Sequence, residues 1–80
     1  MEIVWDEIKR QANVSKHGMD FVDLDMDFFY GATILPARGK RSMAIGTLGG
    51  AAVTVVFSRL GSEAISVVSM RHASAKERDI

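Results

Sequence analysis

The chain has 80 residues, 48% of them hydrophobic, with 10 Lys and Arg against 10 Asp and Glu and no cysteine. This length leaves room for one hydrophobic core, so we expect a single domain over residues 1–80, and the lack of cysteine excludes disulfides, cysteine zinc sites and thiol catalysis, as suits a reducing cytoplasm. No apolar run approaches the roughly 20 residues that cross a bilayer, and acidic residues stand where a secretory signal carries positive charge, so we expect neither export by that route nor a membrane anchor.

Helical spacing starts near the N-terminus. Asp6 is suited to cap a helix, and Gly18 is suited to end it, because glycine tolerates the left-handed conformation that closes helices. Between them, we expect one apolar face toward the core. Its members are Trp5, Ile8, Ala12 and Val14.

A second amphipathic helix is predicted over residues 20–29. Asp20 is a plausible cap, and Tyr30-Gly31 stops the pattern. The stripe that would face the core consists of Phe21, Leu24, Phe28 and Phe29.

After Gly31 the spacing of the apolar residues changes from that of helices to that of β-strands. Gly49-Gly50 indicates a tight hairpin, and Ser74 with Glu77 has the pattern of a capping box that opens a short terminal helix. The predicted class is therefore α+β, with two N-terminal helices packed on a three- to four-stranded antiparallel sheet and a short C-terminal helix. The predicted strands cover residues 32–35, 41–48, 51–58 and 64–70.

Alternation along the last two strands assigns side chains to faces. Val53, Val55, Phe57 and Arg59 share one side of their strand, and in the next strand Ile65, Val67, Ser69 and Arg71 share one side. Antiparallel neighbours have opposite ends adjacent, so a simple hairpin separates Arg59 from Arg71 by about a strand length. The pattern alone therefore does not assemble these two arginines into one site.

Lys16 and His17 form the most distinctive chemical pair. Imidazole exchanges protons near neutral pH, and an ammonium group stabilises phosphoryl charge. From the residues alone, the simpler interpretation of two solvated cations at a helix end is favoured.

The strand-end bases Arg41, Arg59 and Arg71 allow two interpretations. Arg can hold phosphate bidentately, but it also protects edge strands from association. Among the acidic residues, a solvated helix face is favoured over a metal site, and we expect no metal. These residues are Asp20, Asp23, Asp25 and Asp27.

The neutral total hides a division of charge. Residues 1–30 hold seven acids and three bases, whereas residues 31–80 hold seven bases and three acids. The expectation is an acidic helical half and a basic sheet half. A neutral total nevertheless argues weakly against nucleic acid as a partner.

Taken together, several segments resemble one family over nearly the entire chain. The segments are Trp5-Asp6-Glu7 with Lys9, then Asn13, Lys16-His17-Gly18, Phe21, Phe28, Arg41, Ala44-Ile45-Gly46, Val55-Val56-Phe57-Ser58-Arg59 and Ser69-Met70-Arg71-His72-Ala73 with Glu77. In order and spacing they resemble the BrnT toxins of bacterial type II toxin-antitoxin modules. The resemblance implies a fold similar to RelE-type ribonuclease toxins, cleavage of RNA that arrests translation, and neutralisation by a BrnA antitoxin that carries a ribbon-helix-helix DNA-binding domain.

The resemblance also implies site residues. It assigns Lys16, His17, Arg59 and Arg71 to catalysis, and Arg41 and Ser69 to RNA binding, with no cofactor. Departures from the family pattern are Ser58 in place of Thr, Met70 in place of a small residue, and an end at Ile80, short of the customary tail.

Two functions follow as expectations. The first is a metal-independent endoribonuclease toxin of the cytoplasm that contacts RNA, an antitoxin, and DNA only through that antitoxin. The second is a catalytically weak homologue that acts mainly as an antitoxin-binding subunit in DNA-bound autoregulation. Growth arrest on expression of the chain alone distinguishes them.

Overall fold

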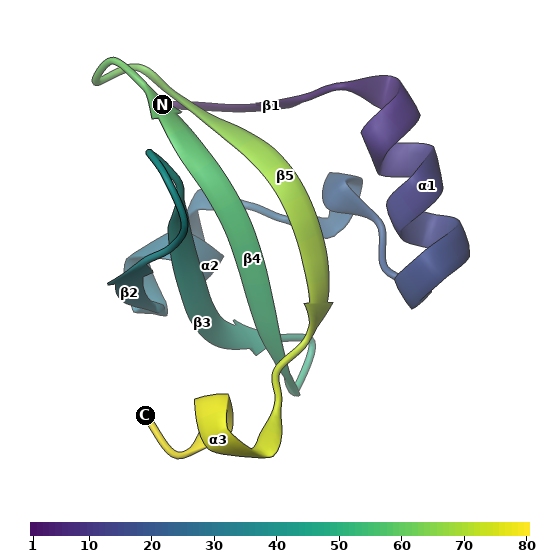
Figure 1. Ribbon diagram of the computed structural model, residues 1–80, viewed down its shortest axis with the longest axis vertical. Helices are drawn as coiled ribbons and strands as arrows, with labels where there is room; N and C mark the ends of the chain where they lie inside the picture. Colours follow the sequence, from purple (N-terminus) through teal and green to yellow (C-terminus); the bar gives the residue numbers. More distant parts are fainter.

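Five strands form one mixed sheet in the computed structural model, which describes residues 1–80 (Figure 1). The spatial order of the strands is β1-β5-β4-β3-β2. None of the helices combines the length and apolar character that a bilayer crossing requires. The elements in chain order are β1 (Glu2–Trp5), α1 (Glu7–His17), the 3₁₀ turn η1 (Phe21–Asp23), α2 (Met26–Gly31), β2 (Thr33–Pro36), β3 (Ser42–Leu48), β4 (Ala51–Leu60), β5 (Ala64–His72) and α3 (Ala75–Arg78).

The α+β class is confirmed, but the expected sheet of three to four antiparallel strands is wrong. The strand that was not predicted is β1, which pairs in parallel with the first half of β5, from Glu2 opposite Ala64 to Trp5 opposite Val67. Four residues are too few to show a clear alternation, and the partner strand lies some 60 positions away in the sequence. A pairing between such distant segments therefore cannot be predicted from the residues near either strand.

The predicted turns and caps are confirmed. Gly49 and Gly50 join β3 to β4 with φ of 58° and 83°, the positive values that a two-residue hairpin turn favours and that glycine adopts without strain. Ser74 and Glu77 form the expected capping box at the start of α3. These signals are reliable because each depends on residues within three positions of one another.

The predicted continuous helix over residues 20–29 is wrong. Asp20 caps η1, and Asp25 caps α2 by accepting a hydrogen bond from the Phe28 N–H at 3.0 Å. Between them, Leu24 is extended, with ψ of 142°. An aspartate that accepts a hydrogen bond from the backbone N–H two or three residues ahead favours the start of a new helix over continuation of the preceding one.

The core lies between the sheet and the segment formed by η1 and α2, which is behind the sheet in Figure 1. Phe29 packs edge-on against Phe57 with ring centroids 5.3 Å apart. Burying side chains of this kind stabilises a fold by about 1.5–3 kcal/mol each. The largest fully buried side chains are Phe21, Phe57, Met70, Val53, Val55, Val67 and Thr54.

Gly46→Ala is expected to destabilise the fold, because β3 passes close to α2 there. An added Cβ would lie 3.1 Å from the Ala32 Cβ and 3.2 Å from the Phe28 Cε1. Overpacking of this kind costs about 1–3 kcal/mol, which urea unfolding measures. The matched control is Gly31→Ala, where the added Cβ meets nothing within 4 Å. Equal stability of the two variants would contradict the expectation.

A bulge in β5 changes which side chains face the core. Val56 of β4 pairs with Ser69 and Phe57 pairs with Val67, so Val68 is the extra residue. The predicted alternation along β5 is therefore wrong beyond Val67. Met70 joins the core instead, 1% exposed, and Ser69 turns to the opposite face of the sheet.

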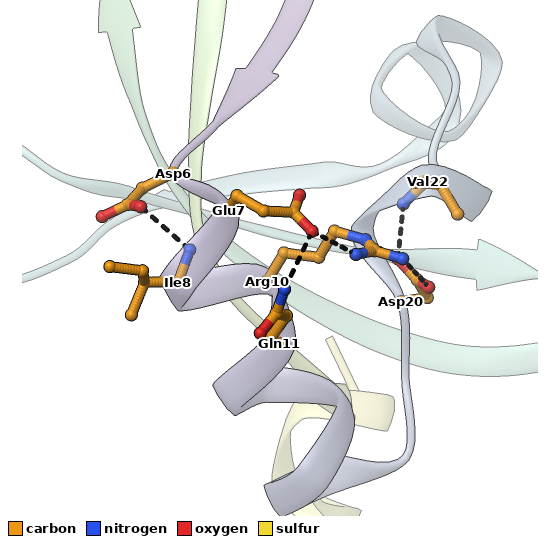
Figure 2. A network of polar contacts seen from close by, with 7 residues as sticks. All are labelled: Asp6, Glu7, Ile8, Arg10, Gln11, Asp20 and Val22. Atoms are coloured by element: carbon orange, nitrogen blue, oxygen red, sulfur yellow. Dashed lines mark hydrogen bonds and ion pairs between the residues drawn. The ribbon is translucent and has the colours of Figure 1, made fainter.

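A polar network fixes α1 against the segment that follows it (Figure 2). The Arg10 guanidinium donates to both carboxylate oxygens of Asp20, at 2.8 and 3.0 Å, and also to Glu7. Hydrogen bonds from Arg10 lower the pKa of the Asp20 carboxyl. Arg10 thus acts as a structural cation that orients α1.

Candidate functional site: a cationic cleft between α1 and β5

Helix α1 directs a polar face toward the sheet. Its N-cap is Asp6, and Gly18 ends it in the left-handed conformation, with φ of 68°. The predicted apolar face is wrong, because Ile8 is 79% exposed and Val14 is 40% exposed. The one buried residue of the helix is Asn13.

Asn13 explains why a polar face is buried. Strand β1 pairs with β5 only as far as Val67, so the backbone edge beyond the bulge has no strand partner. The Asn13 side chain takes that place: its amide donates to the Met70 carbonyl at 2.8 Å, and its oxygen accepts from the Met70 N–H at 3.0 Å. Its amide also donates to the Met19 carbonyl at 3.0 Å. An apolar helix face could not satisfy these backbone groups.

Beside this contact lies an open cleft with a volume of about 260 Å³. Its lining brings together four of the six predicted site residues, although they come from three distant parts of the chain. Helix α1 supplies one wall, the bulged part of β5 supplies another, and the residue just before β3 completes it. The lining residues are Lys9, Ala12, Asn13, Lys16, His17, Arg41, Val68 and Ser69.

The cleft is strongly cationic. Lys9, Lys16 and Arg41 line it together with the imidazole of His17, and no carboxylate is among the eight lining residues. His17 and Ser69 are half-buried, whereas the three cations are exposed at the margin. This arrangement suits an anion that meets a proton-exchanging group and a hydroxyl, with positive charge around it.

The other two predicted site residues lie elsewhere. Arg59 pairs with Ile65 and lines a separate cavity, whereas Arg71 pairs with Thr54 near the other end of β4. The expected separation of the two arginines along the hairpin is thus confirmed. The bulge adds a second separation, because it puts them on opposite faces of the sheet.

Arg71 already has an anionic partner. Its guanidinium donates to both carboxylate oxygens of Glu77, at 2.7 and 2.9 Å. The same carboxylate accepts from the buried Thr54 hydroxyl at 3.0 Å and from the Ser74 N–H at 2.8 Å. Together these bonds attach α3 to the sheet.

Acid is expected to weaken the fold through Glu77. Hydrogen bonding from Arg71 holds the pKa of this carboxyl at about 2, below its ordinary 4.5. A carboxyl with a lowered pKa stabilises the folded state fully above about pH 4.5, and this contribution is lost as the pH falls toward about 2. We expect a loss of about 2 kcal/mol, because solvent screening around the half-exposed Arg71 weakens the pair. Urea unfolding at neutral pH and near pH 2 measures it, and Glu77→Gln should lack this part of the pH dependence. An equal pH dependence in both proteins would contradict the assignment.

Two of the four acidic residues of the second segment have structural partners. Asp20 and Asp25 serve as helix caps, and Asp20 also binds Arg10. No group of three or more His, Asp or Glu side chains gathers as a metal site would require. Capping is the role that the prediction of a solvated helix face missed.

Sequence reasoning did not assign Lys9, Asn13 or Val68 to a site. A signal for the first two was present, because positions 9, 12, 13, 16 and 17 follow the spacing of one helix face. The prediction of an apolar face toward the core did not take this polar face into account. For Val68 the sequence holds no signal, since a bulge depends on how two strands pair.

Comparison with known proteins identifies relatives. The profile of the family described as "Ribonuclease toxin, BrnT, of type II toxin-antitoxin system" matches residues 5–77. Among solved structures, the crystal structure of the Brucella abortus ribonuclease toxin BrnT is similar, with 52% sequence identity and a TM-score of 0.88. The match covers 92% of this chain and 97% of that one. No curated protein matches the chain.

Proposed function

Because the chain belongs to the BrnT family of ribonuclease toxins of type II toxin-antitoxin systems, we propose that it is itself an endoribonuclease and that the cationic cleft is its active site. The observation that carries this proposal is the joint presence of Lys16, His17, Arg41 and Ser69 in one cleft without a carboxylate. RNA is a polyanion that contains its own nucleophile, the 2′-hydroxyl. A site for cleaving it needs positive charge, a proton acceptor and a proton donor.

The proposed reaction is an internal transfer at phosphorus. The 2′-oxygen forms a bond to the adjacent phosphorus while the bond from phosphorus to the 5′-oxygen breaks. The 2′-hydroxyl proton passes to a base, and another proton reaches the leaving 5′-oxygen. His17 exchanges one of these protons, and Lys16 with Lys9 stabilises the charge on the non-bridging oxygens.

Arg41 and Ser69 are proposed to position the RNA. A guanidinium holds a phosphate through two parallel hydrogen bonds, and the Ser69 hydroxyl both donates and accepts. Because these cations supply the charge stabilisation, the proposed mechanism does not depend on a metal ion. Catalytic roles for Arg59 and Arg71 stay predictions, since neither residue lines the cleft.

The partners belong to the same proposal. The chain acts on RNA in the cytoplasm, inhibits translation, and is neutralised by a BrnA-like antitoxin with a ribbon-helix-helix domain. Contact with DNA takes place only through that antitoxin.

A single-turnover cleavage assay on RNA tests the proposal. The purified chain should cleave RNA equally well with EDTA and with added Mg²⁺. A requirement for Mg²⁺ would contradict the mechanism. A complete lack of cleavage, with no growth arrest when the chain is expressed alone, would favour the alternative of a catalytically weak, antitoxin-binding subunit.

A further inference from the structure

A second cavity, with a volume of about 270 Å³, lies away from the cationic cleft. It is formed by α2, the N-terminus and β2, together with the adjoining ends of β4 and β5 and the turn that joins them. Eight of its 11 lining residues are hydrophobic. The buried floor includes Phe57 and Ile65, which face the side of the sheet that α2 covers, whereas Ser69 of the cationic cleft faces the other side.

The rim of this cavity exposes large apolar side chains to water. Tyr30 is 77% exposed, Met1 is 63% exposed and Ile34 is 40% exposed. Three of the eight large exposed hydrophobic residues of the molecule therefore gather around one hollow. Such a cluster is typical of a surface that a protein partner covers.

Arg59 supplies the polar element of the cavity. It is the only charged side chain in the lining, and it takes part in none of the three ion pairs of the molecule. An unpaired guanidinium beside apolar side chains is complementary to a segment that carries apolar residues and a carboxylate. Arginine and tyrosine are also the residue types that contribute most to protein interfaces.

From these observations, we propose that the cavity and its rim are the docking surface for the antitoxin, and that an apolar segment of the antitoxin binds there with an Asp or Glu side chain on Arg59. The inference rests on the proposed function, because a type II toxin has a protein antitoxin as its partner. Docking and RNA cleavage use opposite faces of the sheet. Ile34→Ser should therefore leave RNA cleavage intact.

Calorimetric titration with the antitoxin encoded beside the gene of this chain tests the proposal. Arg59→Glu and Ile34→Ser are each expected to weaken binding by at least about tenfold, since each replaces a side chain that lines the cavity. Ile8→Ser is the matched control, because Ile8 is also an exposed apolar residue but lies on α1. The affinity of this variant for the antitoxin should be unchanged. Thermal unfolding checks that all variants fold.

Three results would overturn the docking surface. The first is unchanged affinity of both Arg59→Glu and Ile34→Ser, and the second is an equal loss in Ile8→Ser. The third is a dimer of the chain alone in sedimentation that Ile34→Ser converts to a monomer, since a second copy would then occupy the cavity.

RNA cleavage by Ile34→Ser separates this inference from the proposed function. Retained cleavage with weakened antitoxin binding supports both. Normal antitoxin binding with retained cleavage rejects the docking surface only. Weakened binding together with a wild-type chain that does not cleave RNA supports the docking surface and rejects the nuclease.

Discussion

His17→Ala is expected to lower the single-turnover rate of RNA cleavage by about 10²- to 10⁴-fold, the range that a positioned acid or base contributes. The imidazole lies at the last position of α1, is half-buried, and lines the cleft with Lys16 and Arg41. The cations that we propose to hold the phosphate remain in this variant. RNA affinity, measured by fluorescence anisotropy, should therefore change little.

The matched control is His72→Ala. His72 is an exposed histidine at the end of β5 and does not line the cleft, so its removal should leave the cleavage rate near that of the wild type. A pH-rate profile adds a second readout, because the limb that depends on imidazole should disappear in His17→Ala alone. Unchanged cleavage by His17→Ala would exclude His17 from the chemistry.

Asn13→Ala is expected to destabilise the fold by about 2–5 kcal/mol. The substitution leaves the N–H and the carbonyl of Met70 without a partner, and each buried unsatisfied group costs about 1–3 kcal/mol. A domain of this size has a total stability of about 4–12 kcal/mol, so the loss is a large share of it. Urea unfolding measures the change in the free energy of unfolding.

Gln11→Ala is the control for this prediction. Gln11 is exposed on the same helix, and its one side-chain hydrogen bond, to Glu7, is long at 3.4 Å. Its removal should change the stability by less than about 0.5 kcal/mol. If Asn13→Ala loses no more than Gln11→Ala, the contact between Asn13 and β5 does not hold α1 in place.

The cleft also changes the interpretation of the charge pattern. The family resemblance places most of the phosphate-binding residues in the basic second part of the chain, which forms most of the sheet. Instead Lys9, Lys16 and His17 come from the first 30 residues, and of the cations in the cleft Arg41 alone comes from the remainder. The acids Asp6 and Glu7 lie at the N-terminal end of α1, where they favour the helix, and do not line the cleft. Counting charge along the chain therefore does not locate the charge in space.

Four of the six residues that the family resemblance singled out line one cleft, whereas the residue pattern by itself did not group them. On pattern alone, the favoured interpretation of Lys16 and His17 was two solvated cations, and Ser69 had no chemical signal of its own. Both segments line the same cleft. Neither route separated Arg71 from that cleft, because its pairing with Glu77 depends on where α3 packs.

What the sequence determined by itself was local. The caps at Asp6 and Ser74, the glycine turn between β3 and β4 and the end of α1 at Gly18 each depend on backbone groups a few residues away, so a short stretch of sequence specifies them. The tertiary structure alone decided the parallel pairing of β1, the bulge at Val68 and the polar face of α1. These features depend on which backbone edge of β5 is left without a partner, and that is settled only when segments some 60 residues apart come together. The cleft forms when these segments pack together, since Asn13 hydrogen-bonds the unpaired backbone edge of β5 and thereby holds Lys16 and His17 beside Ser69.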